Sequence, residues 1–288
     1  MKSTRTLVRT TLNGLSTVAP SLAGRATLWL FRHPLARMKA SPAEQRLLDA
    51  ACQGSTTVAG KHVVTYAWGD GERPVLLLHG WQSRASHLGA LIGGLRERGY
   101  TPVSFDAPGH GASGGRATTI LEYRHIIRQL SAEYGTFDAI IGHSLGVAAA
   151  FLALRGGAAD TGRLVGISGI SDFDYVVDYF CDDLGLRPRL RTELRRRIED
   201  VMFPEEPELW RRFDATDRPH EITARILLLH DERDRYVRPD QSRRTAAAYG
   251  DQAELHTTTG LGHIRVLSDP DVVARALAHV TSRAPVRG

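Results

Sequence analysis

The chain has 288 residues, of which 42% are hydrophobic and 24% charged, and its formal net charge is +5. This length allows one large α/β domain or two small ones, and the composition is that of an ordinary soluble globular protein. Two cysteines, Cys52 and Cys181, are too few and too far apart for a disulfide framework or a zinc site, which fits a cytoplasmic, reducing compartment. No apolar run approaches the roughly 20 residues of a membrane-spanning helix, and no basic patch with interleaved aromatics predicts nucleic-acid binding.

The N-terminal region is basic. Residues 1–43 contain seven Lys or Arg and no acidic residue. A secretory signal is not expected, because Arg9 and Asn13 interrupt any hydrophobic core. We expect residues 1–59 to form an N-terminal helical extension that lies on the domain with three side chains packed inward, namely Leu28, Leu30 and Phe31. The alternative is a basic amphipathic segment that makes weak contact with an anionic membrane surface.

From about residue 60, short apolar runs alternate with segments of helical periodicity. The apolar runs lie at residues 75–78, 102–105, 139–141, 164–167 and 226–229, and the helical segments at 85–98, 118–134 and 145–155. Strands that are apolar throughout, rather than at alternate positions, are buried on both faces. The pattern therefore predicts an α/β fold with a mostly parallel central sheet that is covered by helices on both faces.

The alternation is interrupted once, at residues 171–219, where helical, Arg-rich and acidic sequence replaces the next strand. We expect a small helical cap here, between the two parts of the core at 60–170 and 220–288. Aromatic residues near its start either line an acyl pocket or dock the cap, and Tyr179 and Phe180 are the candidate pocket residues. Six arginines between Arg187 and Arg197 are best explained as a solvated helix face, with attraction of an anionic substrate as the alternative.

A lone hydroxyl stands where one predicted strand meets a helix. Ser144 comes after the apolar run Ala-Ile-Ile and before Val-Ala-Ala-Ala-Phe-Leu, with Gly142 and Gly146 two positions to either side. An abrupt turn from strand to helix strains the turn residue and leaves room only for glycine at these two positions. In a parallel sheet ligands bind at the carboxyl ends of the strands, and the helix N-terminus directs N–H groups at the hydroxyl. The pattern predicts a nucleophile elbow.

Together with this elbow, four other segments resemble the α/β-hydrolase family over roughly residues 60–285. They are VLLLHGW at 75–81, FDAPGHGASGG at 105–115, LLLHDERDRYV at 227–237 and TGLGH at 259–263. The resemblance implies a catalytic triad of Ser144, Asp234 and His263, in the family's own chain order. It also implies an oxyanion hole formed by the backbone N–H groups of Trp81 and Leu145.

Some residues depart from the family pattern or have a simpler explanation. Val147 stands where a further glycine is common, and Asp231 stands where many members have glycine, which introduces a rival carboxylate. We expect His79 and His110 to hold loops through hydrogen bonds rather than to transfer protons. Asp106 is expected to brace a turn.

The implied function is that of a serine hydrolase that cleaves a carboxylic ester or thioester through an acyl-enzyme. The partner is then a small acyl ester, with no nucleic acid, metal or organic cofactor. A serine at the elbow argues against dehalogenase and epoxide-hydrolase chemistry, in which the nucleophile is a carboxylate. Two alternatives remain open: an acyltransferase with the same triad, and a non-catalytic binder that has kept the fold.

Overall fold

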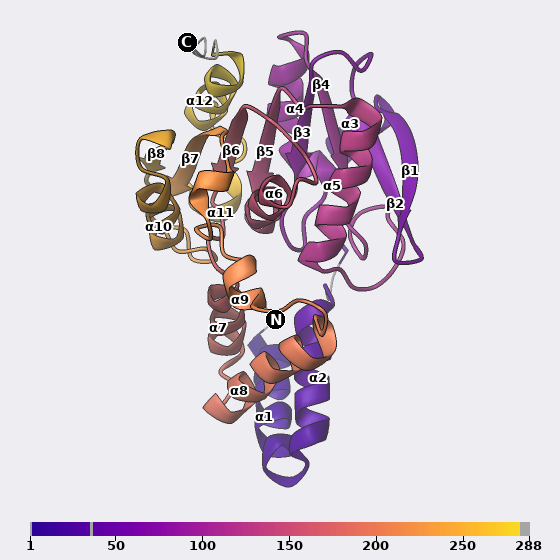
Figure 1. Ribbon diagram of the computed structural model, residues 1–288. Coiled ribbons are helices and arrows are strands. Elements are labelled where there is room, and N and C mark those ends of the chain that lie inside the picture. Colours follow the sequence, from indigo (N-terminus) through magenta and orange to yellow (C-terminus); the bar gives the residue numbers. More distant parts are fainter. Residues whose placement is uncertain (1, 35–36, 283–288) are drawn as a thin grey trace.

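A computed structural model describes residues 2–34 and 37–282. Its centre is an eight-stranded sheet with the strand order β1-β2-β4-β3-β5-β6-β7-β8 (Figure 1). The strands are β1 (Cys52–Val58), β2 (Lys61–Ala67), β3 (Pro74–Leu78), β4 (Thr101–Phe105), β5 (Ala139–His143), β6 (Arg163–Ile167), β7 (Arg225–Asp231) and β8 (Ala253–Thr258). β2 pairs antiparallel with both β1 and β4, and all other pairs are parallel. The predicted fold class is confirmed.

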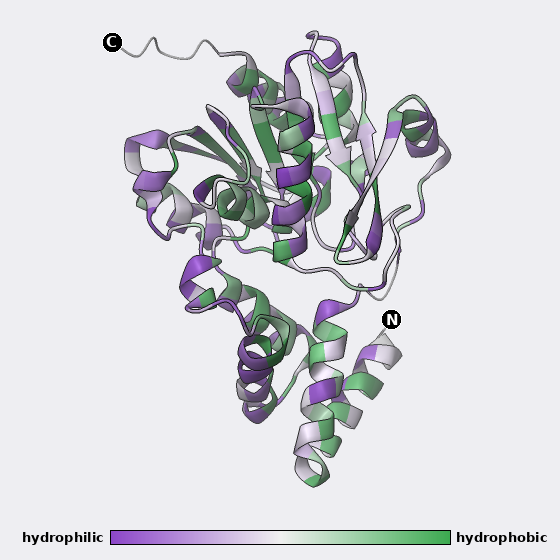
Figure 2. Cartoon of the chain, turned by 45° about the vertical axis from the view of Figure 1, so that its right-hand side comes forward, coloured by the Kyte–Doolittle hydropathy of each residue, from purple (hydrophilic) through white to green (hydrophobic). Residues whose placement is uncertain are grey.

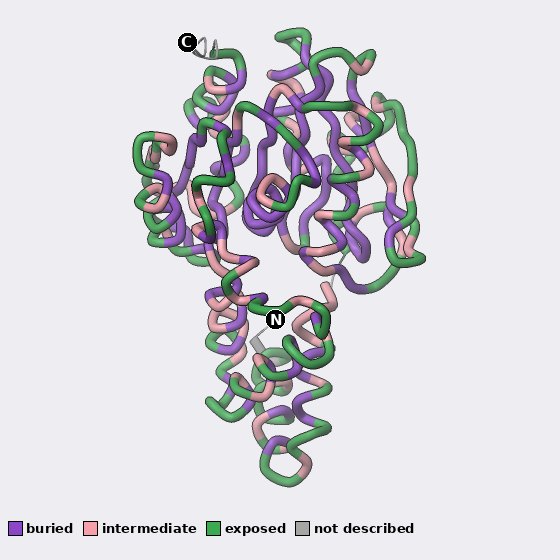
Figure 3. Tube along the Cα trace, in the orientation of Figure 1, coloured by how far each residue is buried: buried purple, intermediate pink, exposed green. Residues whose placement is uncertain are grey.

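Helices cover both faces of the sheet because successive strand residues point to opposite faces and nearly all are apolar. Val75 and Leu77 belong to one hydrophobic cluster, and Leu76 and Leu78 to the other. The first cluster includes side chains of α3 (Pro42–Asp49), α4 (Gly89–Arg96) and α12 (Pro270–Thr281). The second includes side chains of α5 (Ile120–Tyr134), α6 (Leu145–Arg155) and α10 (Asp240–Tyr249). Figure 3 shows the central strands as the buried part of the molecule.

The boundary between the expected N-terminal extension and the core differs in the structure. Residues 1–59 were expected to be a helical extension, yet β1 lies within this range and forms the edge of the sheet next to β2. The sequence of β1, CQGSTTV, is mostly polar and mostly exposed, so it lacks the apolar pattern that reveals the central strands.

Beyond one end of the sheet lies a helical unit built from two distant parts of the chain (Figure 1). The first part is a hairpin of α1 (Lys2–Val18) and α2 (Pro20–Arg32). The second is the insert between β6 and β7, which contains α7 (Phe173–Leu184), α8 (Pro188–Arg197), a π-helical turn (Ile198–Met202) and α9 (Leu209–Arg212). Both hairpin helices pack against α7 or α8.

The expected inward side chains of the N-terminal region thus face mainly the insert. Leu28 is buried and Leu30 partly buried. The ring of Phe31 meets the rings of Phe173 and Phe180 edge to face, at centroid distances of 6.1 and 5.3 Å. These aromatic contacts join the start and the middle of the chain in one unit.

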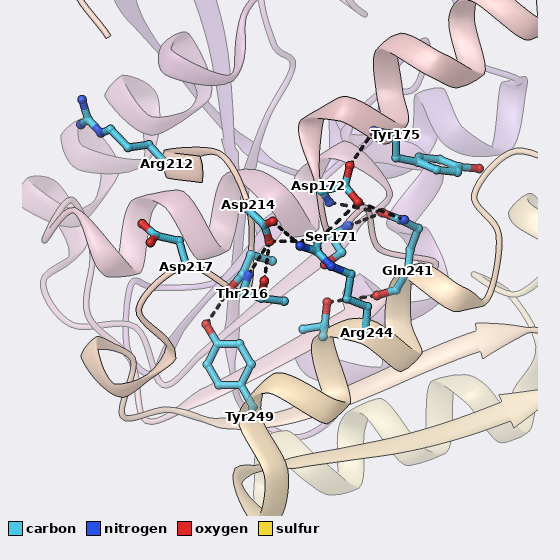
Figure 4. Close-up of polar contacts among 12 residues, drawn as sticks. Ser171, Asp172, Tyr175, Arg212, Asp214, Thr216, Asp217, Gln241, Arg244 and Tyr249 are labelled. Atoms are coloured by element: carbon cyan, nitrogen blue, oxygen red, sulfur yellow. Dashed lines mark hydrogen bonds and ion pairs between the residues drawn. The ribbon is translucent and has the colours of Figure 1, made fainter. Parts of the chain in front are cut away.

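Polar contacts fasten both ends of the insert to α10 (Figure 4). At the first end, Gln241 Oε1 accepts hydrogen bonds from the N–H groups of Ser171 and Asp172, at 3.0 and 3.2 Å. Arg244 then spans the two ends, because its guanidinium lies 3.3 Å from Asp172 Oδ2 and 3.1 Å from Asp214 Oδ1. The first and last segments of the insert are therefore held by the same helix.

Two further residues hold the returning end. Arg155, the last residue of α6, donates to the carbonyl oxygens of Arg212 and Asp214 at 3.0 and 2.8 Å. Tyr249 OH donates to Ala215 O at 2.9 Å. A buried guanidinium that satisfies several backbone carbonyls fixes this segment tightly.

Candidate active site

Ser144 occupies the turn between β5 and α6 and has an unusual backbone conformation. Its φ is 55°, in the left-handed region that non-glycine residues seldom adopt. Its N–H donates to Ile167 O on the neighbouring strand at 3.0 Å, and Ile170 N–H donates to Ser144 O at 3.4 Å. Strain of this kind costs on the order of 1–3 kcal/mol and persists where surrounding structure fixes it, often at functional sites.

The flanking glycines are required by close backbone contacts. A Cβ atom on Gly146 would lie 2.3 Å from Leu78 O, and one on Gly142 would lie 2.7 Å from Val147 N. Val147, where the family pattern favours glycine, is accommodated by the loop after β6. There, a Cβ atom on Gly169 would lie 2.7 Å from Val147 Cγ1. The space for the Val147 side chain thus comes from a glycine on another segment.

His263 and Asp234 form a hydrogen-bonded pair. His263 lies on the short helix α11 (Gly262–Arg265), and its Nδ1–H donates to Asp234 Oδ2 at 2.7 Å. The other carboxylate oxygen of Asp234 accepts from the N–H groups of Tyr236 and Val237, at 2.9 and 3.0 Å. Burial by itself would raise the pKa of Asp234, but the imidazoles of His230 and His263 outweigh burial and hold it well below its usual range. Asp234 therefore stays ionised beside His263.

Asp231, the rival carboxylate, is committed to other partners. It accepts hydrogen bonds from Thr258 OH and Leu261 N–H, both at 2.9 Å, and from Arg233 N–H at 2.9 Å. Burial opposes ionisation, but these bonds prevail and lower the pKa of Asp231 to about 2. The side chain ties the end of β7 to the loop that leads to His263.

His143 is a site residue that sequence reasoning did not single out. Its Nε2–H donates to the carbonyl oxygen of His263 at 3.0 Å, and the two rings lie 4.6 Å apart. Its Nδ1 is buried and has no hydrogen-bond partner among the described residues. Burial, with the charge of His263 acting in the same direction, lowers the pKa of His143 to about 3. The neutral imidazole thus connects the Ser144 turn to the His263 loop.

Within the described part of the chain, no hydrogen bond joins Ser144 Oγ to the His263 ring, although His143 brings their backbones together. Hydrogen bonds of this kind are frequently long in ligand-free sites and tighten when substrate binds.

The expected oxyanion N–H groups border the Ser144 turn. A Cβ atom on Gly80 would lie 2.8 Å from Ser144 Cβ, so the loop that carries Trp81 touches the turn. His79 Nε2 accepts from Ala107 N–H at 3.0 Å, and His79 Nδ1–H therefore donates to Gly80 O at 2.7 Å. In a planar trans peptide the next N–H, that of Trp81, points away from this carbonyl. Leu145 begins α6, so its N–H has no acceptor in an earlier helical turn.

Asp106 and His110 brace the loops beside this site. Asp106 accepts hydrogen bonds from Ala85 N–H at 2.9 Å and from Ala112 N–H at 2.8 Å. His110 Nε2 accepts from Gln82 N–H at 3.0 Å, and burial lowers the pKa of His110 to about 3. These contacts join the two loops that follow β3 and β4 at the carboxyl ends of the strands.

A family model for the alpha/beta hydrolase family matches residues 75–276, well over half of the chain. This protein belongs to the α/β-hydrolase family. The resemblance seen in the sequence is thereby confirmed, and the chain has the fold of a hydrolase. A comparison with curated protein sequences gives no match.

Solved structures of other α/β hydrolases share the fold at low sequence identity. An esterase from Pyrococcus furiosus has a TM-score of 0.64 and 19% identity, and the match covers 85% of this chain and 97% of that one. A monoacylglycerol lipase from Paleococcus ferrophilus has a TM-score of 0.58 and 23% identity, with 75% and 99% covered. The thioesterase domain from the curacin biosynthetic pathway has a TM-score of 0.57 and 16% identity, with 81% and 100% covered.

In this α/β hydrolase the insert touches the loop that carries Asp234. Tyr175 OH donates to Tyr236 O at 2.8 Å and accepts from Arg238 N–H at 3.0 Å. Of the two candidate pocket residues, Tyr179 stacks beside Tyr175 at 6.2 Å, and Phe180 packs against the N-terminal hairpin. A hollow of about 680 Å³ elsewhere on the insert is lined by residues 199, 200 and 203–210, none of them a candidate catalytic residue.

Among the described residues, no group of three or more His, Cys, Asp or Glu side chains is arranged to hold a metal ion. The helices of the described ranges include none with the length and apolar character needed to cross a bilayer.

Proposed function

We propose that this α/β hydrolase is a serine hydrolase that cleaves carboxylic esters or thioesters. Ser144 is the nucleophile, His263 the general base and Asp234 the residue that orients the base. The observation that carries the proposal is the 2.7 Å bond from His263 Nδ1–H to Asp234, beside a serine with a strained backbone at the end of a central strand. Nucleophile, base and orienting acid are the three parts that such catalysis requires.

In the proposed reaction His263 Nε2 takes the proton of the Ser144 hydroxyl while Ser144 Oγ attacks the carbonyl carbon. The N–H groups of Trp81 and Leu145 stabilise the oxyanion. The tetrahedral intermediate collapses to an acyl-enzyme, and the protonated His263 gives its proton to the leaving alcohol or thiol. Water then attacks the acyl group in the same way, which releases the acid and restores Ser144.

We also infer that residues 171–219 act as a cap that selects the acyl group, with Tyr179 and Phe180 as the candidate pocket residues. The contact from Tyr175 to the Asp234 loop supports a position of the insert beside the site. The two free cysteines are compatible with a cytoplasmic enzyme, and a small acyl ester is the only partner that this chemistry needs.

A panel of nitrophenyl esters of graded chain length tests the proposal. Ser144→Ala should reduce kcat by about 10³- to 10⁶-fold while the circular dichroism spectrum stays that of the wild type. A fluorophosphonate probe should label the wild-type protein at Ser144, which peptide mass spectrometry can locate. Ser131→Ala, a serine near the end of α5, serves as the matched control and should leave turnover and labelling unchanged.

Other outcomes would contradict the proposal. Labelling at another residue would reject Ser144 as the nucleophile. A folded protein that neither labels nor turns over any ester would indicate a non-catalytic binder. Acyl esters of an added alcohol, formed in place of the free acid, would indicate an acyltransferase that uses the same triad.

A further inference from the structure

The hairpin of α1 and α2 extends from the helical unit, away from the α/β core (Figure 1). Its inner side packs on α7 and α8, and its outer side faces solvent. Figure 2 shows hydrophobic residues along both of its helices. The hairpin is thus an amphipathic element, only one side of which is used within the protein.

Large apolar side chains are concentrated on the solvent side of the hairpin. Among the described residues, eight large hydrophobic side chains are exposed, and four of them belong to this hairpin. They are Leu7, Val18, Leu22 and Trp29, which are 67%, 81%, 47% and 53% exposed. Leu22, Arg25 and Trp29 follow one another at spacings of three and four residues, so they share one face of α2. Val18 ends α1 at the tip of the hairpin.

Part of the positive charge around the hairpin is left without a counter-charge, although Arg5 of α1 pairs with Asp183 at 2.9 Å. Several arginines of α8 are neutralised by carboxylates, because Arg191 pairs with Asp178, Arg195 with Asp174, and Arg197 with Glu193. In the described ranges, by contrast, no carboxylate lies within ion-pair distance of Arg9, Arg25, Arg187 or Arg189.

Contacts between the hairpin and the insert place two of these arginines at the junction of the two. Arg187 donates from its guanidinium to Thr17 Oγ1 at 3.3 Å, near the tip. Arg9 Cδ lies 2.8 Å from where a Cβ atom on Gly185 would be, at the junction of α7 and α8. The first 43 residues contain no acidic residue that could offset this charge.

We propose that the α1–α2 hairpin docks the protein on an anionic lipid surface. Val18, Leu22 and Trp29 enter the boundary between headgroups and acyl chains, while Arg25 and Arg187 lie among the phosphates. A protein partner would bury a larger and drier patch, whereas isolated apolar side chains interleaved with unpaired arginines match the layered chemistry of a lipid interface. This docking goes beyond the proposed catalysis and does not depend on it.

Docking would also bring the helical unit, which contains the insert, next to the lipid surface. Phe31 at the end of α2 packs against Phe173 and Phe180 of the insert, so the hairpin and the insert are positioned together.

Sedimentation of the full-length protein with vesicles tests the proposal. We expect binding to vesicles of phosphatidylcholine with about 30% phosphatidylglycerol, and about tenfold weaker binding to phosphatidylcholine alone. Raising the salt concentration from about 0.1 M to about 0.5 M should release most of the bound protein. The double variant Leu22→Ser/Trp29→Ser and the single variant Arg25→Glu should each reduce binding by about tenfold.

Matched control variants separate the contribution of the hairpin to vesicle binding from general effects of surface polarity and charge. Val201→Ser removes a side chain that is 55% exposed on the insert, and Arg96→Glu reverses an exposed charge on α4. Both should bind vesicles like the wild type. All variants should keep the circular dichroism spectrum and the melting temperature of the wild type, which shows that they are folded and keeps this test apart from that of the catalytic proposal.

Three results would overturn the proposal: no vesicle binding by the wild type, binding that ignores lipid charge and salt, or equal losses in the control variants. A fourth contradicting result could come from light scattering, which measures the oligomeric state. If the protein is a dimer that Leu22→Ser/Trp29→Ser converts to a monomer, the outer face of the hairpin is an interface between two copies.

Discussion

Replacing Asp234 by asparagine tests which carboxylate orients the base. Asp234 Oδ1 accepts the N–H groups of Tyr236 and Val237, at 2.9 and 3.0 Å, and only an oxygen can serve there. In Asp234→Asn the side-chain carbonyl therefore keeps these two bonds, and the NH2 group faces His263 Nδ1. Because two donors cannot face each other, the imidazole must shift its proton from Nδ1 to Nε2. In that tautomer Nε2 cannot accept the proton of Ser144.

The size of the effect follows from this change of tautomer. We expect kcat to fall by about 10³- to 10⁴-fold, as expected for a triad whose base is held in the wrong tautomer. The free energy of unfolding should change by only about 1 kcal/mol, because a neutral hydrogen bond between the new amide and Nδ1 remains.

Asp231→Asn is the matched control, three residues away. The new NH2 group would face N–H or O–H donors that the carboxylate accepts, so we expect a loss of about 1–3 kcal/mol in stability and little loss of turnover. The pKa of Asp231 in the folded state, about 2, lies below its unfolded value near 4. The stability that it contributes is thus complete above about pH 4 and is lost as the pH falls towards about 2, a dependence that the variant should lack.

The assay is ester turnover on purified variants, together with urea unfolding at several pH values. If Asp231→Asn loses most of the turnover while Asp234→Asn stays active, the orienting acid is Asp231 and the argument from the hydrogen bonds is refuted.

Three more changes test other parts of the site. His143→Phe keeps a ring beside the Ser144 turn but removes the bond to the base loop, so kcat should fall by about tenfold with KM unchanged; a change in KM alone would reject a positioning role. Gly146→Ala places a methyl group 2.3 Å from a backbone carbonyl oxygen and should lower the free energy of unfolding by about 1–3 kcal/mol in urea, which wild-type stability would contradict. Tyr179→Ala/Phe180→Ala should alter the ratio of rates on long and short acyl esters. Equal loss of both rates, with a lower melting temperature, would make these side chains structural.

The central part of the sheet could be predicted because its strands are marked by runs of consecutive apolar residues. Each parallel strand is buried on both faces and so is apolar at every position, as in residues 139–141. The need for glycine at positions 142 and 146 could also be predicted, because the close backbone contacts of the turn leave no room for a side chain. The motif order points to Ser144, Asp234 and His263 as candidates, and a 2.7 Å hydrogen bond joins the last two.

Other features depend on contacts that the local sequence does not reveal. β1 and β8 (Ala253–Thr258) are edge strands. β8 has no buried residue and β1 has only one, so neither has an apolar run. The hairpin docks through small residues, Ala23 and Gly24 among them, which leave only a weak helical pattern. The role of His143 could not be predicted because its hydrogen-bond partner, the carbonyl group of His263, lies 120 positions away in the chain. A histidine placed between an apolar strand and the candidate nucleophile was the one available signal.

The contacts of the insert limit how it could control the site. Arg244 holds both of its ends to α10, and Tyr175 binds the backbone on either side of Val237, whose N–H in turn binds Asp234. A movement of the insert as a whole would break these bonds and disturb the residue that orients His263. Substrate selection without loss of the triad must therefore come from the side chains of the insert rather than from its displacement. In Tyr175→Phe the ring stays but both hydrogen bonds to the 236–238 backbone are lost, so turnover on short and long esters should decline together.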